Sequence, residues 1–263
     1  MISIIIPTYR NPEHLDICLF SAINQQFYKN EIIVAVDGFI EESQEVLDKY
    51  KDNISVLDLG QNQGMQMALN LGVMNATNEI LFIVNDDNVF GKDFDKNIVD
   101  LSDESIVLTL NQIEPTGPGI FNFPVNNLGL NPKEFEYDRF IKYEQSISID
   151  EVTLDGGIFP FSIYKKHYMA VGGFDTMYQS PFICDWDFFL KLDLIGLNFF
   201  RTHKSHLYHF GSSATKNGKE GDKFKATENP AAQMFRYKWG IDPKLYLNNS
   251  HRPKGKFVKG IKF

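Results

Sequence analysis

The sequence predicts an α/β fold in which a mostly parallel central sheet is flanked by helices. Strand-like and helix-like patterns alternate four times in about the first ninety residues, and this alternation is typical of parallel sheets with right-handed crossovers. The strand-like segments are short apolar runs, as expected of strands that are covered on both faces. Beyond about residue 110 the pattern becomes irregular. We therefore expect a regular first half and an irregular C-terminal half.

The regular half has clear start and stop signals. Asn11-Pro12 begins the first helix, because Asn is a good N-cap and Pro fits the first helical position. Apolar residues at helical spacing carry that helix to about Gln26. In order, the expected strands are 2–6, 31–36, 54–57 and 80–84, and the expected helices are 12–26, 41–50 and 65–76.

The second half has fewer regular elements. We expect strands at 105–109, 198–202 and 206–210, and helices at 132–145, 164–171, 183–194 and 230–239. Residues 111–132 are rich in Asn, Pro and Gly and predict a long loop, which in a compact domain is usually functional or mobile. Asp155-Gly156-Gly157 indicates a close approach of the backbone either to a ligand or to another strand.

Polar residues follow three of the predicted strands. They are Thr8-Tyr9-Arg10, Asp37-Gly38 and Asp86-Asp87. Ligands of parallel sheets bind at the carboxyl ends of the strands, so we expect these groups to meet at one edge. Adjacent carboxylates repel each other, and a divalent cation with a phosphate ligand would stabilise them. The alternative is a solvated turn, since Asn85-Asp86-Asp87-Asn88 consists of residues that favour turns.

Composition excludes some classes of function. A formal charge of −8 argues against a nucleic-acid-binding protein. Two cysteines cannot form a disulfide framework, and the first apolar run is too short for a signal peptide or a membrane span. We expect a cytoplasmic protein of a bacterium, or a viral one in the host cytoplasm. The basic tail is either a solvated end or a weak contact with an anionic membrane surface or an acidic partner; it comprises Arg252, Lys254, Lys256, Lys259 and Lys262.

Eight motifs occur in an order and at spacings that resemble the family 2 glycosyltransferases with the GT-A fold. They are SIIIPTYR, EIIVAVDG, NQGMQMALNLG, VNDDNVF, GG at 156–157, VGGFD, CDWDFFLKLDLIG and HFGSS. The resemblance covers roughly residues 2–215 and implies a Rossmann-like, mostly parallel sheet with an irregular acceptor-side half. It divides the catalytic domain 1–215 into a nucleotide-binding half, 1–110, and an acceptor-binding half, 111–215. Residues 216–263 would be a C-terminal helical extension with the basic tail.

The resemblance implies an inverting transfer of a sugar from a nucleoside-diphosphate sugar, with a UDP-sugar favoured, to an acceptor hydroxyl on a glycan. Mn²⁺ or Mg²⁺ would stabilise the charge that builds on the leaving diphosphate. Asp87 matches the metal ligand of the family's aspartate motif, and Asp86 matches the residue that contacts the ribose or supports the metal. His209 is a second candidate ligand, which would favour Mn²⁺; the alternative is a histidine satisfied at a strand end.

The nucleotide pocket would be formed by residues of the first half. The matching positions are Pro7, Thr8, Tyr9, Asp37, Asn62 and Asp86. Tyr9 could stack on the base, and Asp37 could accept a hydrogen bond from a ring N–H. The sequence departs from the family at Val36, where an acid is usual, at Phe39, where Ser is common, and at Leu69, which replaces an arginine.

Asp185 matches the general base that takes the acceptor's proton. Asp187 points in a different direction on the same helix, so it is either solvated or supports a neighbouring loop. Asp155, Gly156 and Gly157 match the donor-sugar segment. Trp186 could pack against the acceptor, although an aromatic residue on a helix is more often part of the core. The loops 111–132 and 213–225 are where a lid over the donor would lie.

Two other functions remain open. A sugar-nucleotide pyrophosphorylase would need a Gly-rich basic loop after the first strand, and PTYRNPEH is not such a loop. A non-catalytic sugar- or nucleotide-binding module is favoured by Cys184, which stands where the family has an acid. Donor hydrolysis by the purified protein with Mn²⁺ would separate an enzyme from such a module.

Overall fold

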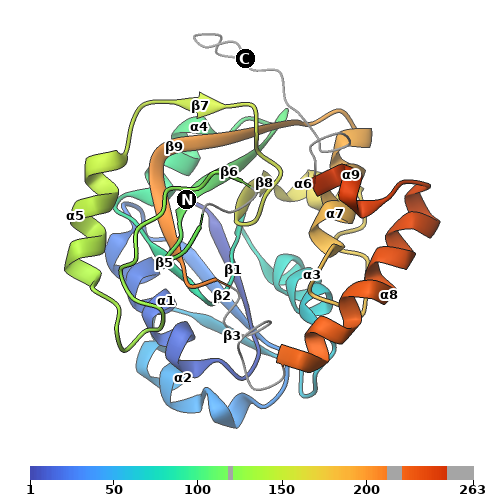
Figure 1. Ribbon diagram of the computed structural model, residues 1–263. Coiled ribbons are helices and arrows are strands. Elements are labelled where there is room, and N and C mark those ends of the chain that lie inside the picture. Colours follow the sequence, from blue (N-terminus) through green and yellow to red (C-terminus); the bar gives the residue numbers. More distant parts are fainter. Residues whose placement is uncertain (118–120, 212–220, 248–263) are drawn as a thin grey trace.

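The first half of the chain folds into four parallel strands joined by helices, as expected (Figure 1). The computed structural model describes residues 1–117, 121–211 and 221–247. The expected helix at 41–50 is divided at Ser43 into a 3₁₀ turn and an α-helix. The elements are β1 (Ser3–Thr8), α1 (Pro12–Gln25), β2 (Glu31–Val36), η1 (Ile40–Glu42), α2 (Gln44–Tyr50), β3 (Ser55–Asp58), α3 (Met65–Asn75) and β4 (Ile80–Ile83).

The second half contains elements that the sequence did not reveal, namely β5, α4, β7, β8 and α9. In order it comprises β5 (Asn88–Phe90), α4 (Phe94–Leu101), β6 (Ile106–Ile113), α5 (Tyr137–Ile147), β7 (Val152–Thr153), β8 (Phe161–Tyr164), α6 (Lys165–Ala170), α7 (Cys184–Leu194), β9 (Asn198–His209), α8 (Gly221–Trp239) and α9 (Pro243–Leu247).

Several expected boundaries in this half were wrong. The two strands expected at 198–202 and 206–210 are the single strand β9, whose register against β6 shifts between Leu110 and Asn111. Strand β6 runs to Ile113 and takes the first residues of the expected loop. Helix α5 begins at Tyr137 rather than at residue 132. Helix α8 includes Pro230 instead of starting there, so residues 221–225 of the expected lid are helical; residues 212–220 and the basic tail lie outside the described residues.

The strands form one mixed sheet in the order β3-β2-β1-β4-β8-β6-β9-β5, with β7 paired to β9. Strands β1 to β4 are parallel, and the antiparallel strand β8 lies between β4 and β6. Because β6 and β9 then run in the same direction as β4, their carboxyl ends lie at the same edge as those of β1, β2 and β4. That edge holds every sequence-predicted polar strand end.

Alternate residues of the central strands enter two cores on opposite faces of the sheet. On one face Ile5 and Ile33 pack with α3, α6 and α7 and with residues of α8 and α9. On the other face Ile4 and Ile6 pack with α1, α2 and α4. Figure 1 shows these two helical layers on either side of the strands. A third cluster joins α5 to β5 and the end of β9.

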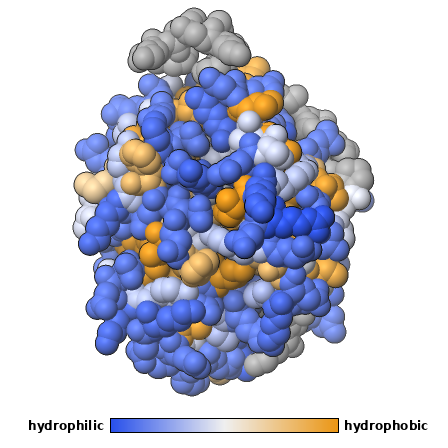
Figure 2. All heavy atoms as spheres, turned by 90° about the vertical axis from the view of Figure 1, so that its left-hand side faces the viewer, coloured by the Kyte–Doolittle hydropathy of each residue, from blue (hydrophilic) through white to orange (hydrophobic). Residues whose placement is uncertain are grey.

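The surface that carries α5 is mainly hydrophilic. Figure 2 shows apolar side chains there as separate patches between polar ones. Within the described ranges, none of the helices has the length and apolar character needed to cross a membrane.

A buried polar pair joins α5 to β9. The Glu144 carboxylate accepts a hydrogen bond from the backbone N–H of His206 at 3.1 Å, and both side chains are buried. The Nδ1 atom of His206 lies 3.3 Å from the Ser148 hydroxyl. Burial, with help from the positive charges of His203 and Arg201, lowers the pKa of His206 to about 4. Burial raises the pKa of Glu144.

His206 should make the fold sensitive to acid. Between about pH 6.5 and pH 4 the unfolded chain binds a proton at this imidazole that the folded chain does not, so stability falls as the pH falls. We expect His206→Asn to remove up to about 3 kcal/mol of this loss by pH 4. Urea unfolding at several pH values between 4 and 7.5 measures it. Glu144→Gln should act in the opposite sense and steepen the loss, and identical slopes for all three proteins would contradict this account.

Candidate active site

The carboxyl ends of β1 and β4 meet as the sequence predicts. The Thr8 hydroxyl donates a hydrogen bond to Asp86 Oδ2 at 2.7 Å. The Asn11 side-chain amide donates to the other oxygen, Oδ1, at 3.0 Å. Pro7 precedes this junction and pairs with Ala35 of β2. Asp86 is therefore oriented by the end of β1 and the start of α1.

Two carboxylates are buried side by side at this edge. Asp86 is 6% and Asp87 4% exposed. Burial, and then the neighbouring charge of Asp87, raise the pKa of Asp86 to about 7, although the bonds from Thr8 and Asn11 act in the opposite direction. The expected alternative of a solvated turn does not describe this pair. A cation at the pair would relieve the repulsion.

His209 lies opposite Asp87. It pairs with Asn88 across the β5–β9 ladder, and the backbone N–H of Phe210 donates to the Asp87 carbonyl at 3.2 Å. The Nε2 atom of His209 is 3.6 Å from Asp87 Oδ1, and its Nδ1 atom is 3.3 Å from Glu114 Oε1. A carboxylate on one ring nitrogen fixes the orientation of a histidine and leaves the other nitrogen to face the site.

Asp87 and His209 fit a divalent cation in part. Two atoms that each lie about 2.1 Å from one ion are at most about 4.2 Å apart, so a separation of 3.6 Å allows both to bind it. Within the described part of the chain, no group of three or more His, Cys, Asp or Glu side chains is arranged to hold a metal. The remaining ligands would have to be oxygens of a bound molecule or water.

Three residues at this site were not identified as site residues from the sequence. Asn11 was recognised only as a helix cap, and His14 lies one turn later on the same helix, with its Nδ1 2.8 Å from Asn11 Oδ1. The Nε2 atom of His14 is buried, and no hydrogen-bond partner for it is found among the described residues. Glu114 lies just beyond β6, in a stretch that reads as loop. The i, i+3 spacing of Asn11 and His14 could have indicated that the two side chains lie together at the start of the helix. No pattern in the sequence around Glu114 indicates that it belongs to the site.

Asp37, at the end of β2, accepts hydrogen bonds from the backbone of the loop before α3. Its Oδ1 accepts the backbone N–H of Gln63 at 2.6 Å, and its Oδ2 accepts that of Gly64 at 3.0 Å. Asn62 is exposed in the same loop. Gly38 packs so closely on that loop that a Cβ there would lie 2.7 Å from the Asn62 nitrogen. Contact between Asp37 and a base stays a prediction, while its carboxylate orders residues 62–64.

The two acids of α7 have separate environments. Asp185 is half-buried in the first turn of the helix. Asp187 is completely buried and supports neighbouring elements: its Oδ1 accepts hydrogen bonds from Trp239 at 2.9 Å and Tyr178 at 3.3 Å, and Lys238 lies 2.8 Å away. Of the two, this leaves Asp185 as the candidate base.

Trp186 packs on the C-terminal helices. Its ring is stacked on Tyr246 of α9 with a centroid distance of 4.9 Å, and the edge of Phe235 of α8 approaches it. Tyr246 also donates a hydrogen bond to the Gly157 carbonyl at 3.3 Å. The core alternative for Trp186 therefore has direct contacts, and its contact with an acceptor stays a prediction.

The backbone near Gly156 approaches a strand. A Cβ on Gly156 would overlap the backbone N, C and O atoms of Phe200 in β9. The adjacent Asp155 forms an ion pair with the buried Arg201 of the same strand. Of the two expected explanations for this segment, the neighbouring strand is the one with visible contacts.

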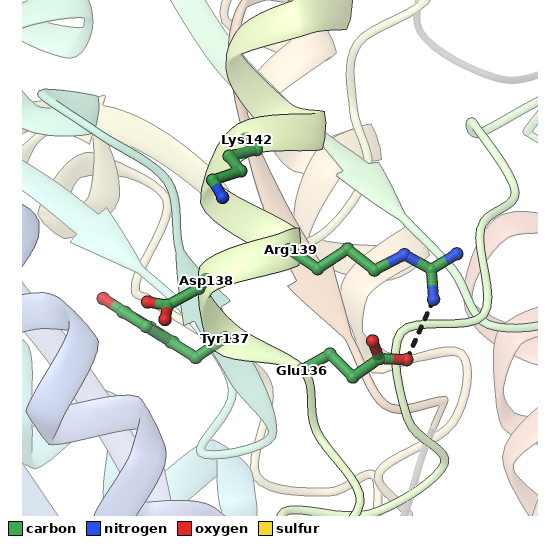
Figure 3. A pocket seen from close by; sticks show the side chains of 5 residues that line it. All are labelled: Glu136, Tyr137, Asp138, Arg139 and Lys142. Atoms are coloured by element: carbon green, nitrogen blue, oxygen red, sulfur yellow. Dashed lines mark hydrogen bonds and ion pairs between the residues drawn. The ribbon is translucent and has the colours of Figure 1, made fainter.

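A hollow at the start of α5 is lined by none of these residues; Figure 3 shows its lining, Glu136, Tyr137, Asp138, Arg139 and Lys142. Its lining is mixed in charge, and Glu136 and Arg139 are paired with each other at 2.9 Å. Tyr137 there contacts Gln25 at the far end of α1 rather than the strand ends that carry Asp86 and Asp87. We do not assign it to the site.

Comparison with known proteins identifies a family. The model of the family described as Glycosyl transferase family 2 matches residues 3–166. An uncharacterized glycosyltransferase of Haemophilus influenzae is 25% identical over 196 residues, 73% of this chain and 62% of that protein. Glycosyltransferase GlyG of Streptococcus pneumoniae is 30% identical over 92 residues, 34% of this chain and 31% of that protein. The chain thus spans less than two thirds of the length of these relatives.

Solved structures share the fold. TarS 1–349 of S. aureus in complex with UDP-GlcNAc has a TM-score of 0.60 and 17% identity, covering 94% of this chain and 75% of that one. The mannosyltransferase PcManGT from Pyrobaculum calidifontis, in complex with GDP-Man and Mn²⁺, has a TM-score of 0.59 and 17% identity, covering 95% and 68%. This likeness confirms the expected GT-A fold.

The contact between Gly156 and β9 can be tested by stability. Gly156→Ala should cost about 1–3 kcal/mol or more, because the backbone of Phe200 cannot move aside as a side chain could. Gly60→Ala is the control, since a Cβ there meets nothing within 4 Å and only its φ of +72° opposes it. Urea unfolding compares them. Unchanged stability with reduced nucleotide-sugar affinity would mean that this backbone approaches a ligand instead.

Proposed function

Because the chain belongs to Glycosyl transferase family 2, we propose that it is an inverting glycosyltransferase that moves a sugar from a nucleoside-diphosphate sugar to an acceptor hydroxyl, for which we favour a glycan. The observation that carries the proposal is the buried Asp86–Asp87 pair facing His209 at the carboxyl edge of the sheet. A UDP-sugar remains the favoured donor. TarS binds UDP-GlcNAc and PcManGT binds GDP-Man, so structural likeness alone does not select the base.

In this proposal the first half of the chain holds the donor. Thr8 fixes one oxygen of Asp86 and Asn11 fixes the other, so that the carboxyl group has one orientation when it meets the ribose. The loop ordered by Asp37 lies beside it. Tyr9 lies beyond the end of β1, where a base bound at this edge would lie. These hydrogen bonds would keep the Asp86 carboxyl group in place when a nucleotide binds.

Asp87 and His209 would hold Mn²⁺ or Mg²⁺, and Glu114 would keep the His209 ring in place. When bound, such an ion stabilises the negative charge that builds on the departing diphosphate. Mn²⁺ is favoured because imidazole is a better ligand for it than for Mg²⁺. PcManGT, a fold neighbour, binds Mn²⁺ with its donor.

Asp185 would remove the proton from the acceptor hydroxyl as that oxygen attacks the anomeric carbon. The C–O bond to the diphosphate breaks as the new glycosidic bond forms on the opposite face, which inverts the configuration. Gln66 of α3 donates to the Ser180 carbonyl, and Thr227 of α8 bonds the Ser180 hydroxyl at 2.8 Å. The segment before Asp185 is therefore held from both sides, which favours a fixed position for a general base.

Metal binding tests the assignment of Asp87 and His209 as ligands of the cation. Asp87→Ala and His209→Ala should each weaken Mn²⁺-dependent binding of UDP by at least about tenfold, because each removes a ligand. Isothermal titration calorimetry with and without Mn²⁺ measures this directly. Glu134→Gln, at an exposed position of the loop before α5, is the control. Full Mn²⁺-dependent affinity in both variants would refute the metal assignment.

The base assignment predicts a different pattern. Asp185→Asn should lower the rate of transfer by about 10²–10⁴-fold while UDP affinity stays within about twofold, since a general base acts in the reaction and not in donor binding. Transfer from radiolabelled UDP-sugars to mixed glycan acceptors, scored beside UDP binding, gives both numbers. Asp187→Asn is the comparison, because its loss should appear as a lower melting temperature. Undiminished turnover of Asp185→Asn would exclude Asp185 as the base. Absence of donor hydrolysis and of transfer by the unsubstituted protein with Mn²⁺ would favour a non-catalytic module.

A further inference from the structure

An exposed aromatic ring lies at the edge where the proposed nucleotide would bind. Phe39 follows β2 directly after Gly38 and is 42% exposed. The guanidinium of Arg10, which follows the neighbouring strand β1, lies over its ring at 4.5 Å from the centroid. The Tyr9 ring approaches Phe39 edge-on at 6.0 Å. Two adjacent strand ends thus hold one aromatic side chain between them.

The position of this ring is fixed by a second set of contacts. The Arg10 guanidinium forms an ion pair with Glu42: Nε donates a hydrogen bond to Oε1 at 2.8 Å, and Nη2 lies 2.7 Å from the same oxygen. The guanidinium is therefore held over the Phe39 ring, because its pairing with the Glu42 carboxylate limits where the Arg10 side chain can move. A ring that is both exposed and braced is pre-organised to contact a ligand.

The backbone at both positions is strained. Arg10 has a φ of +52° and Phe39 a φ of +57°. Residues other than glycine rarely adopt this left-handed conformation, and bulky ones still less often. Such strain persists where the surrounding structure enforces it, and it is concentrated at ligand clamps and active sites. Here it turns Phe39 and Arg10 toward each other at the ends of two parallel strands.

The Asp37 carboxylate, which could accept a hydrogen bond from a base at this edge, already accepts hydrogen bonds from the backbone. Both oxygens of Asp37 accept backbone N–H groups of residues 63 and 64. Its neighbour Val36 is apolar and buried. A base at the end of β2 would therefore meet the aromatic surface of Phe39 beside a carboxylate that already orders the chain, and every nucleobase presents a flat face to such a surface.

We propose that Phe39, braced by Arg10, is the surface on which the nucleobase of the donor stacks, so that stacking on this ring contributes to the affinity for a nucleotide whichever base it carries. This inference rests on the proposed function, since it needs a nucleoside diphosphate at this edge. Phe39 is then a specificity-determining residue: it distinguishes a nucleoside diphosphate from a diphosphate without a base.

The test compares ligands with and without a base. Affinities for UDP, GDP, ADP, CDP and inorganic pyrophosphate are measured by calorimetry in Mn²⁺ for the full chain. Phe39→Asn removes the ring and keeps a residue that tolerates a left-handed backbone. We expect it to weaken all four nucleoside diphosphates by similar factors, between about 5-fold and 150-fold, and to leave pyrophosphate within about twofold. Phe39→Tyr should retain wild-type affinities.

Phe27→Asn is the matched control. Phe27 is also an exposed phenylalanine, at 57%, but it precedes β2 and so lies toward the opposite edge of the sheet. Its substitution should change none of the five affinities. Equal weakening of pyrophosphate by Phe39→Asn, or unchanged nucleotide affinities, would overturn the stacking role while leaving the proposed function in place. If the wild-type chain binds neither pyrophosphate nor any of the nucleotides with Mn²⁺, the proposed function fails and the inference fails with it.

Discussion

The structure depends on two adjacent carboxylates that are buried at the end of a central strand. Burial removes water from Asp86 and Asp87 while each charge disfavours the other, and the pKa of Asp86 rises to about 7 as a result. The chain offsets part of this cost with hydrogen bonds from Thr8 and Asn11 to Asp86, and His209 lies 3.6 Å from Asp87. The elements that supply these groups are far apart in the sequence. They meet because parallel strands bring their carboxyl ends to one edge, and the insertion of antiparallel β8 keeps β6 and β9 in that direction.

A second buried carboxylate fixes the other side of the site. Asp187 has no exposed surface, and an isolated charge there would be strongly destabilising. Lys238 of α8 approaches it at 2.8 Å and also reaches Asp175 at 2.7 Å. The C-terminal helices are therefore more than a covering layer, since they supply the nearer of the two lysines that approach this buried acid; Lys191 of α7 lies 3.8 Å away. Removing α8 would remove Lys238 from that acid and expose the core residues against which Phe235 of the same helix packs.

The sequence predicted what local patterns and strand direction determine. The apolar runs located β1 to β4, and their polar ends did converge, as the bond between Thr8 and Asp86 shows. Strand β8 was missed because its four residues follow a proline and lead directly into α6, so no period of useful length exists. Glu114 was missed because its contact with His209 depends on the pairing of β6 with β9, a relation across more than ninety residues. Gly156 was recognised as a close approach, but only coordinates could show that Phe200 was the neighbour.

Backbone strain is distributed unevenly along the described chain. In the described part of the chain five residues other than glycine have positive φ, and three of them lie at the candidate site: Arg10, Phe39 and Ile183, which immediately precedes α7. Ile183 is the least expected, because a β-branched residue is rarely left-handed. The conformation turns the chain into α7 so that Cys184 is buried while the Asp185 side chain remains partly exposed.

A glycine at Arg10, Phe39 or Ile183 would adopt the same φ at lower cost. It would also lose the side chain that each position presents: the guanidinium over Phe39, the ring itself, and the buried isoleucine that anchors α7 in the core. The strain is therefore a consequence of placing bulky side chains where the backbone must turn sharply at a strand or helix end, and that requirement is strongest at the edge where a ligand has to be held.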